Sequence, residues 1–544
     1  MVKLKKLVVS LMALSMAASI AGCSSGSKDS AKVMYSNGGP EEFFETPWLN
    51  PGTYVYNKVL YSHLISADED LNPKKDSKDA LATSYDYSKD GKTLTFELRD
   101  DAYWHDGTKV TPEDVKWSIE YASKTAVINA VFKSTFGAIE GSDDGKAKTF
   151  SGIKTEGNKI TITFAKVAPD ALLTFTQFAP LPKAQLENVD PLKLQQDKFW
   201  QKPIGSGPFK VGEVKMKDYT TLVPNDKYYN GVADYNITLT ASPGDSDPNL
   251  VKNAKSGQID YAYTKSVADL KALKDDSHVT TTPVNVRYTR LLFVNKFPKK
   301  DGTTSPMADP KVRQAIRYGI DMKSIGKNLF ADAAIPANSL IPEDSYKASG
   351  LNNYDYNPEK AKALLKEANW NPDTTIEVVY YYTDQLTVDL MTAIQNNLKD
   401  IGVNMKFKLL DGDLASLLWK APADQKNGPT AVDWDMAYGA IAALSLHEYY
   451  DRFLTGSPTN SNTPEDPELN ALIKATNASA NLEDQKKAFQ NLSKYENENL
   501  FEIPLFYQPI YALTSKKIEG NLDLKKLGTP QFNYDWNIQN WKLK

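Results

Sequence analysis

The sequence has very little cysteine and histidine. It holds one cysteine, Cys23, and four histidines in 544 residues. A single cysteine cannot form an internal disulfide or a multi-cysteine metal site. The histidines (His63, His105, His278 and His447) show no recognisable ligand spacing. We therefore expect neither a metal site nor a cofactor.

Basic residues and long apolar runs are also scarce. Lysine and arginine total 64 against 68 acidic residues, for a net charge of −4, and no basic tract stands out. This balance disfavours a nucleic acid partner. Beyond the N-terminus, the longest apolar candidate, residues 437–446, is too short to cross a membrane and is predicted to be a buried strand or core segment. We expect a soluble monomer of two or three domains.

Catalytic motifs are missing as well. There is no Gly-x-Ser-x-Gly elbow, no P-loop, and no His-Glu-x-x-His, since His447 and Glu448 are followed by Tyr449, Tyr450 and Asp451. Two Ser-x-x-Lys matches are short enough to arise by chance. The sequence therefore disfavours an enzyme.

The most specific feature that is present lies at the N-terminus. Three lysines among the first six residues precede an apolar run, residues 7–20, which is too short to span a bilayer comfortably. This pattern predicts a secretory signal peptide, residues 1–22. Its removal takes three positive charges and leaves −4 − 3 = −7. The polar residues 23–33 that follow are predicted to be a flexible tether.

The residues before the cysteine indicate how the chain is anchored. Ile-Ala-Gly-Cys at residues 20–23 resembles a bacterial lipobox. The resemblance implies that Cys23 is acylated and becomes the first mature residue. We therefore expect a lipid-anchored protein on the extracellular face of the cytoplasmic membrane, held there by its N-terminal lipid only.

Strand and helix patterns alternate along the chain. Residues 84–87 and 93–99 alternate in polarity around a turn and predict a hairpin. Thr111, followed by Pro112, opens a predicted helix. A strand, a helix and a strand over residues 375–410 predict a parallel βαβ unit. With no internal repeat, the predicted fold class is α/β with mixed α+β sheets.

Several blocks, in their order, resemble the peptide/nickel-type solute-binding proteins called family 5. Each block alone is weak, but their combination from about residue 80 to residue 510 is specific. The blocks are residues 90–99 (DGKTLTFELR), 104–108 (WHDGT), 111–115 (TPEDV), 205–211 (GSGPFKV), 293–295 (FVN), 309–316 (DPKVRQAI) and 356–361 (YNPEKA).

The resemblance implies a two-lobed periplasmic-binding-protein-like clamshell with an extra small domain. Ligand would lie between the lobes, and closure would be driven by contacts made to both of them. Hinge strands would lie near residues 280–287 and 506–512. The expected parts are lobe I (34–70, 204–280 and 511–544), an accessory domain (71–203) and lobe II (281–510).

The resemblance also implies the biological role. The protein would bind oligopeptides or dipeptides and deliver them to the permease and ATPase of an ABC importer, which must be separate chains because this one has no P-loop and no membrane span. An oligosaccharide-binding receptor of the same fold is the alternative. A nickel receptor is less favoured, because the histidines are scattered.

Turn chemistry explains most of the shared blocks. Gly107, Gly205 and Gly207 are expected to adopt backbone angles that other residues avoid. His105 is expected to stabilise a turn rather than to act as a catalyst or a metal ligand.

One departure from the family bears on the ligand. Family members specialised for short peptides place an aspartate in a Gly-Trp-x-x-Asp stretch, where it pairs with the peptide N-terminus. The corresponding run here, residues 439–448, has neither the tryptophan nor the aspartate. Either Glu448 or Asp451 substitutes from a shifted position, or the ligand is a longer peptide or an uncharged molecule.

Aromatic residues are the second clue to the ligand. Rings supply pockets for peptide side chains or stacking platforms for sugars, although a single aromatic is more often part of a core. Trp48 lies between two prolines in an irregular segment and is expected to have no core to join. The predicted ligand-binding residues are Trp48, Asn50, Tyr54, Tyr56, Tyr381, Trp419, Trp434, Tyr438, Glu448 and Tyr449.

Overall fold

A computed structural model describes residues 32–50, 54–68, 72–242, 247–284, 286–519 and 538–544. The signal peptide, Cys23 and nearly all of the tether lie outside these residues. Within the described part of the chain, no helix is both long and apolar enough to cross a membrane.

The first lobe is built on a seven-stranded mixed sheet. Its strand order is β10-β17-β9-β1-β8-β7-β6, in which β1 runs parallel to β8 and β9. Strands from both ends of the chain therefore meet in one sheet. The elements are β1 (Lys32–Gly39), α1 (Val55–Leu60), β6 (Phe209–Lys215), β7 (Tyr219–Pro224), β8 (Tyr235–Ala241), α6 (Leu250–Lys255), β9 (Tyr261–Thr264), α7 (Val267–Leu273), β10 (Val279–Val284) and β17 (Ile510–Ser515), with a short pair of β18 (Ile518–Glu519) and β19 (Lys542–Leu543).

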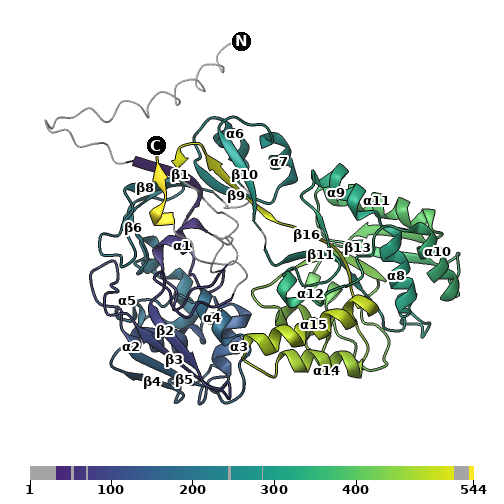
Figure 1. Cartoon of the computed structure of the whole chain (residues 1–544), viewed down its shortest axis with the longest axis horizontal. Coiled ribbons are helices and arrows are strands. Elements are labelled where there is room, and N and C mark those ends of the chain that lie inside the picture. The colour runs from purple at the N-terminus through teal and green to yellow at the C-terminus, as the bar shows by residue number, and fades with distance from the viewer. Residues whose placement is uncertain (1–31, 51–53, 69–71, 243–246, 285, 520–537) are drawn as a thin grey trace, which may run out of the picture.

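A four-stranded antiparallel sheet, in the order β2-β3-β5-β4, lies below the first sheet in Figure 1. The predicted hairpin is confirmed as β2 and β3, and the predicted helix start is confirmed at Thr111, which forms a capping box with Asp114. The elements are β2 (Ala82–Tyr87), β3 (Thr93–Leu98), α2 (Pro112–Ala122), α3 (Ala130–Gly137), β4 (Ile153–Glu156), β5 (Lys159–Thr163), α4 (Ala171–Gln177) and α5 (Lys183–Leu186).

The second lobe is built on a six-stranded sheet, in the order β12-β16-β11-β15-β13-β14. The predicted βαβ unit is confirmed, because β13 and β14 pair in parallel and α11 connects them. The elements are β11 (Tyr288–Val294), α8 (Pro310–Gly319), α9 (Met322–Phe330), β12 (Ile335–Pro336), α10 (Pro358–Glu367), β13 (Thr375–Tyr380), α11 (Gln385–Asp400), β14 (Asn404–Leu409), α12 (Leu414–Leu418), β15 (Met436–Ala442), α13 (His447–Tyr450), α14 (Pro467–Thr476), α15 (Leu482–Asn499) and β16 (Ile503–Tyr507).

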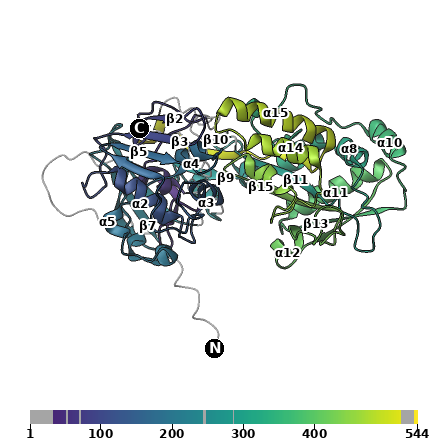
Figure 2. The same cartoon turned by 90° about the horizontal axis from the view of Figure 1, so that it is seen from below.

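The chain passes between the two large sheets at two neighbouring places. Strand β10 ends in the first sheet at Val284 and β11 begins in the second at Tyr288, whereas β16 ends in the second sheet at Tyr507 and β17 begins in the first at Ile510. Figures 1 and 2 show the resulting two masses with these strands between them. The crossings fall where the sequence analysis places hinge strands. The predicted domain limits and the hinge motion itself stay predictions.

The turn around His105 is structural, as expected. Its Nδ1 accepts a hydrogen bond from the Gly205 N–H at 3.0 Å, and its Nε2 lies 3.1 Å from the Gly207 carbonyl. Burial lowers the pKa of His105 to about 4. The imidazole is therefore neutral at pH 7 and joins two of the family blocks.

The prediction that Gly205 and Gly207 adopt backbone angles that other residues avoid is wrong. Only Gly107 has a positive φ, of 88°. Gly205 and Gly207 are required by close packing instead, because a Cβ on Gly205 would lie 1.9 Å from the Leu60 carbonyl oxygen and one on Gly207 would lie 2.4 Å from that of Val59. Sequence alone does not separate a conformational need for glycine from a steric one.

Candidate functional site

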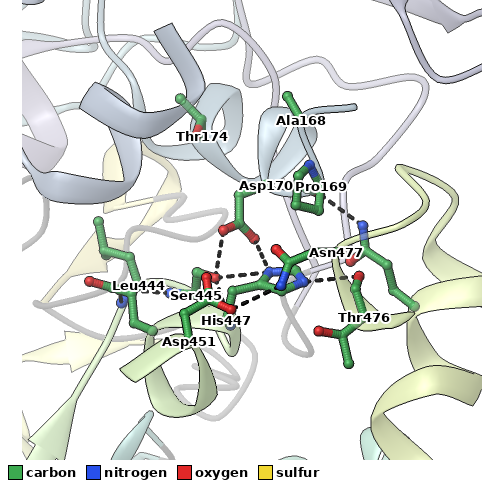
Figure 3. Close-up of polar contacts among 12 residues, drawn as sticks. Ala168, Pro169, Asp170, Thr174, Leu444, Ser445, His447, Asp451, Thr476 and Asn477 are labelled. Carbon is green, nitrogen blue, oxygen red and sulfur yellow. Dashed lines mark hydrogen bonds and ion pairs between the residues drawn. The ribbon is translucent and has the colours of Figure 1, made fainter. Parts of the chain in front are cut away.

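Polar contacts join the accessory sheet region to the second lobe. Asp170 is the N-cap residue of α4, and its Oδ1 lies 2.8 Å from Nδ1 of His447 at the start of α13 (Figure 3). Its other oxygen accepts a hydrogen bond from the Ser445 hydroxyl at 2.7 Å. Nε2 of His447 lies 3.1 Å from the Thr476 carbonyl oxygen, so both ring nitrogens are engaged. The imidazole is held from both sides.

The electrostatics of this contact favour an ion pair. Burial by itself raises the pKa of Asp170, but His447 and Ser445 outweigh burial and lower that pKa below its usual value. Burial likewise opposes a charged imidazole, yet the Asp170 carboxylate raises the pKa of His447 above its usual value. Each group therefore stabilises the charged form of the other.

A second contact crosses at the same place. Gln485 of α15 donates from Nε2 to the carbonyl oxygen of Pro169 at 2.8 Å. Figure 1 shows α15 beside the α3 and α4 region, in agreement with this bond. The accessory sheet region and the second lobe are thus in polar contact on the side away from the strand crossings.

A cavity of about 570 Å³ lies near the strand crossings. Residues 265–268 and Lys271, in and before α7, line one part of it. Residues of α9, α11, β11 and β15, together with Asp384 and Gln508, line the rest. Lys271 donates to the carbonyl oxygen of Leu329 at 3.2 Å, and Val267 packs in the hydrophobic cluster of the second lobe. The cavity is therefore lined from both lobes.

Arg290 and Tyr438 of the second sheet line this cavity, and further tyrosine rings pack against Arg290. The guanidinium carbon of Arg290 lies 4.4, 5.0 and 5.8 Å from the ring centroids of Tyr382, Tyr288 and Tyr438. Such contacts stabilise a cation through the negative faces of the rings. Burial raises the pKa of Tyr382 to about 12, so that ring stays neutral.

Of the predicted ligand residues, Tyr438 lines the cavity, whereas Tyr381 contacts Tyr382, which packs against Arg290. The Tyr381 hydroxyl is 3.2 Å from that of Tyr382. Arg290, Lys265 and Lys271, which line the cavity, were not among the predicted ligand residues. A usable signal was present for Arg290, because it is the one charged residue in the strand at residues 289–294, which is otherwise apolar after Thr289.

The prediction that Trp48 lacks a core to join is wrong. Its side chain is fully buried, its ring stacks on Phe178 at 5.7 Å, and its Nε1 donates to the carbonyl oxygen of Ala179 at 2.8 Å. The flanking prolines shape a segment that folds into the core of the accessory region. Trp48 therefore packs rather than presenting a face to the cavity.

The other predicted ligand-binding residues of the N-terminal segment, Asn50, Tyr54 and Tyr56, lie close together. Tyr56 is buried and stacks on the half-buried Tyr54 at 4.9 Å, and the Tyr54 hydroxyl donates to Glu45 at 3.2 Å. Asn50 is exposed, and its carbonyl oxygen accepts a hydrogen bond from Asn57. None of the three lines the cavity of about 570 Å³.

Three aromatic candidates from the second lobe belong to one hydrophobic cluster. Trp434 donates from Nε1 to the Leu417 carbonyl oxygen at 2.8 Å, and Tyr449 is fully buried. Trp419 packs edge-on against Phe293 at 5.5 Å and is only partly buried. Packing accounts for Trp434 and Tyr449, which leaves Trp419 as the more accessible of the three.

The two acidic candidates are already engaged in local structure. Glu448 accepts hydrogen bonds from the backbone N–H groups of Leu444 and Ser445, at 2.9 and 3.2 Å. Asp451 accepts one from the Asn477 amide at 2.9 Å. Burial raises the pKa of both carboxyl groups. They hold the turn that carries His447 in place.

The described residues contain no group of three or more histidine, cysteine, aspartate or glutamate side chains that could hold a metal ion.

The structure thus has a two-lobed fold with a cavity lined from both lobes. The chain belongs to the bacterial extracellular solute-binding proteins, family 5, whose model matches residues 77–463. The predicted family and fold class are confirmed. A Brucella ovis protein, provisionally named as an ABC transporter peptide-binding protein, is 25% identical over 488 residues, which are 87% of this chain and 86% of that protein.

Solved structures show the same fold. NikZ from Campylobacter jejuni, in complex with Ni(L-His), matches with a TM-score of 0.68 at 24% identity over 94% of this chain and 99% of that chain. Lactococcal OppA, complexed with an endogenous peptide in the closed conformation, matches with a TM-score of 0.67 at 21% identity over 92% and 98%. At these identities the likeness concerns the fold alone.

Proposed function

We propose that this protein is the lipid-anchored receptor of an ABC importer and that it binds oligopeptides between its lobes. The observation that carries the proposal is the cavity of about 570 Å³ lined from both lobes, because a ligand held there contacts both lobes at once. The volume lies within the range usual for small-ligand sites, about 300–1,000 Å³. The peptide-binding name of the Brucella relative supports the ligand class.

The protein captures its ligand and releases it unchanged to a permease and an ATPase, which are separate chains. Closure about the two strand crossings would enclose the ligand, and opening would release it. The side chains lining the cavity are mixed in character, with three cationic residues and two acids beside apolar surface. That mixture matches a peptide, whose backbone and termini are polar and whose side chains vary.

Ligand binding is tested by thermal shift on the mature chain, residues 23–544, after unfolding and refolding to remove any carried-over ligand. The panel contains random-sequence peptide pools, oligosaccharides and a nickel–histidine complex. A ligand at 100 times its Kd stabilises the folded form by about 2.7 kcal/mol. We expect a higher Tm with peptides. A rise with oligosaccharides or nickel–histidine only, and none with peptides, would overturn the proposal.

Anchoring is tested separately in the native bacterial host. Cys23→Ser removes the proposed acylation site, and Ser24→Ala is the matched control. We expect the Cys23→Ser protein to lose palmitate labelling and to leave the membrane fraction, while the control keeps both. Retention of label and membrane association by Cys23→Ser would exclude lipidation at this residue.

A further inference from the structure

One partly buried arginine in the second lobe, Arg290, differs from the buried arginines of the described chain. Arg287 and Arg452 pair with the carboxylates of Glu343 and Glu502. Arg313 and Arg317 donate to backbone carbonyl oxygens from several nitrogens each. The fold therefore satisfies these four cations internally.

Arg290 is satisfied only in part. Its Nε donates to Oε1 of Gln508 at 2.8 Å, whereas its Nη1 is buried and has no hydrogen-bond partner among the described residues. Within the same residues, Arg290 takes part in no ion pair. A guanidinium carries five N–H donors, and leaving a buried one unpaired is costly. The chain thus maintains a partly buried cation with spare donors.

The surroundings of Arg290 fix its orientation. Tyr288 and Tyr382 contact the guanidinium, and Gln508 donates in turn to the Lys265 carbonyl oxygen at 3.4 Å. Gln508 lies between β16 and β17, at one of the two strand crossings. The cation is therefore held in place before any ligand arrives, which lowers the entropic cost of binding.

The charges around the cavity favour an anion beside Arg290. Lys265 and Lys271 add two positive charges to its lining, and Asp384 and Asp389 supply two negative ones. Both acids are engaged within the first turns of α11: Asp384 accepts from the Thr387 N–H at 2.9 Å, and Asp389 accepts from Gln385. Within the cavity lining, the unsatisfied donors of Arg290 thus lack a protein carboxylate.

We propose that Arg290 binds a carboxylate of the captured peptide, which makes this cavity the anionic subsite of the receptor. The inference rests on the proposed function. A carboxylate accepts two parallel hydrogen bonds from a guanidinium, and the buried setting strengthens them. The same chemistry is offered by a peptide C-terminus and by an acidic side chain.

The subsite also explains how a peptide is oriented without the Gly-Trp-x-x-Asp anchor. One fixed end is enough to set the direction of an extended chain in the cleft. The lysines at the α7 side lie on the opposite lobe from Arg290, so a carboxylate here is attracted by both lobes. Binding at this point therefore favours the closed arrangement.

The test is calorimetry with one peptide that the thermal-shift pool identifies, in free-acid and C-terminally amidated forms. Two further peptides, both amidated, carry aspartate or asparagine at an internal position. We expect the loss of the recognised carboxylate to weaken binding to the wild type about 10- to 100-fold, as for a hydrogen-bonded charge. The terminal pair and the internal pair identify which carboxylate is bound.

Variants assign the effect to Arg290. In Arg290→Gln, the affinity difference between the matched peptides is expected to disappear, and Arg290→Lys is expected to restore only part of it because lysine cannot bind bidentately. Arg99→Gln is the control, since Arg99 also stacks on a tyrosine, at 3.6 Å from the Tyr229 centroid, but does not line the cavity. It is expected to keep the full difference.

The experiment distinguishes a failure of the proposed function from a failure of the carboxylate subsite. If no peptide binds the wild type, the proposed function fails. If peptides bind but neither amidation nor the aspartate-to-asparagine change alters the affinity, the proposed function stands and the carboxylate subsite is overturned. This wild-type comparison needs no variant, so it holds even if Arg290→Gln does not fold.

Discussion

Asp170 and His447 form an ion pair, with 2.8 Å between Oδ1 and Nδ1, across a sequence separation of 277 residues. Asp170 occupies the N-cap position of α4 in the accessory region, and His447 begins α13 in the second lobe. The pair thus joins parts of the molecule that must separate if the cleft opens on this side. Its strength bears directly on the equilibrium between open and closed arrangements.

The first prediction concerns the pH dependence of this contact. The pKa of His447 is raised, so its stabilising effect is complete below about 6.5, the unfolded-state value, and is lost as pH rises through the folded pKa. The pKa of Asp170 is lowered, so its contribution is lost only in acid. Asp451, Arg287 and Glu448 are the neighbouring charged groups, and burial raises the pKa of both carboxyl groups among them. We expect the ligand-free protein to become more open between pH 6 and pH 9.

Small-angle scattering measures that opening as an increase in the radius of gyration. Asp170→Asn should be more open at pH 6 and should show little further change with pH. Asp86→Asn, an exposed residue of β2, is the control and should behave as the wild type. An unchanged radius of gyration for the wild type across this pH range would contradict the prediction.

The second prediction concerns Trp48. Trp48→Phe keeps the stacking on Phe178 but removes the donor to the Ala179 carbonyl oxygen and leaves a small void. We expect a loss of about 1–3 kcal/mol in the free energy of unfolding, measured by urea denaturation, with peptide affinity unchanged. Trp370→Phe, at a partly exposed ring, should cost much less. A selective loss of affinity in Trp48→Phe would restore Trp48 as a ligand contact.

The third prediction concerns Glu496, a buried carboxyl group of α15. Burial raises its pKa to about 8, and Ser339 donates to one oxygen while the other has no partner among the described residues. An acid with a raised folded pKa loses stability as pH rises from about 4.5 to 8. Glu496→Gln should therefore stabilise the protein at pH 8, by an amount on the order of 1–3 kcal/mol, and have little effect near pH 4.5.

The matched control for Glu496 is Glu502, which is buried but paired with Arg452. Glu502→Gln should destabilise the protein, because it leaves a buried arginine unpaired. Thermal denaturation of both variants at pH 5 and pH 8 provides the comparison. Equal effects of the two substitutions at pH 8 would show that Glu496 has a partner that stabilises its charge.

The fourth prediction concerns Gly205. Gly205→Ala would place a methyl group 1.9 Å from the Leu60 carbonyl oxygen, so the backbone must move and the His105 hydrogen bond to the Gly205 N–H must weaken. We expect a large drop in Tm and in soluble yield, equivalent to about 3 kcal/mol or more. Ser206→Ala, at the next residue, removes a buried hydroxyl with no partner in the described structure and should be nearly neutral. A normal Tm for Gly205→Ala would show that the turn can relax.

Elements with a strong local signal were predictable. Thr111 before Pro112 caps a helix where the sequence analysis places one, and Asp309 before Pro310 and Asn357 before Pro358 cap helices in the same way. The reason is local: a side-chain oxygen accepts from a backbone N–H two or three residues away, and proline presets the first helical turn. Local chemistry of this kind needs no tertiary information.

The candidate site was less predictable. Trp48 and Tyr449 were singled out by residue type, but the fold buries both rings in hydrophobic clusters. Arg290 was missed, although a charge inside an apolar strand was visible. Whether that charge was paired depended on residues such as Gln508 and Tyr382, which are distant in sequence. Residue type indicates what a side chain can do, and only its surroundings show whether it is already in use.

The sequence by itself determined the family, the mixed α/β class and the local elements, because motifs, caps and strand periodicity are set by neighbouring residues. Only the tertiary structure decided which charges meet. It brought Asp170 to His447, satisfied four buried arginines and left Arg290, which lines a cavity, with a buried donor nitrogen that has no partner among the described residues. The physical reason is that burial and pairing depend on contacts between distant segments, and the free energy of a charge depends on those contacts far more than on its neighbours in the chain.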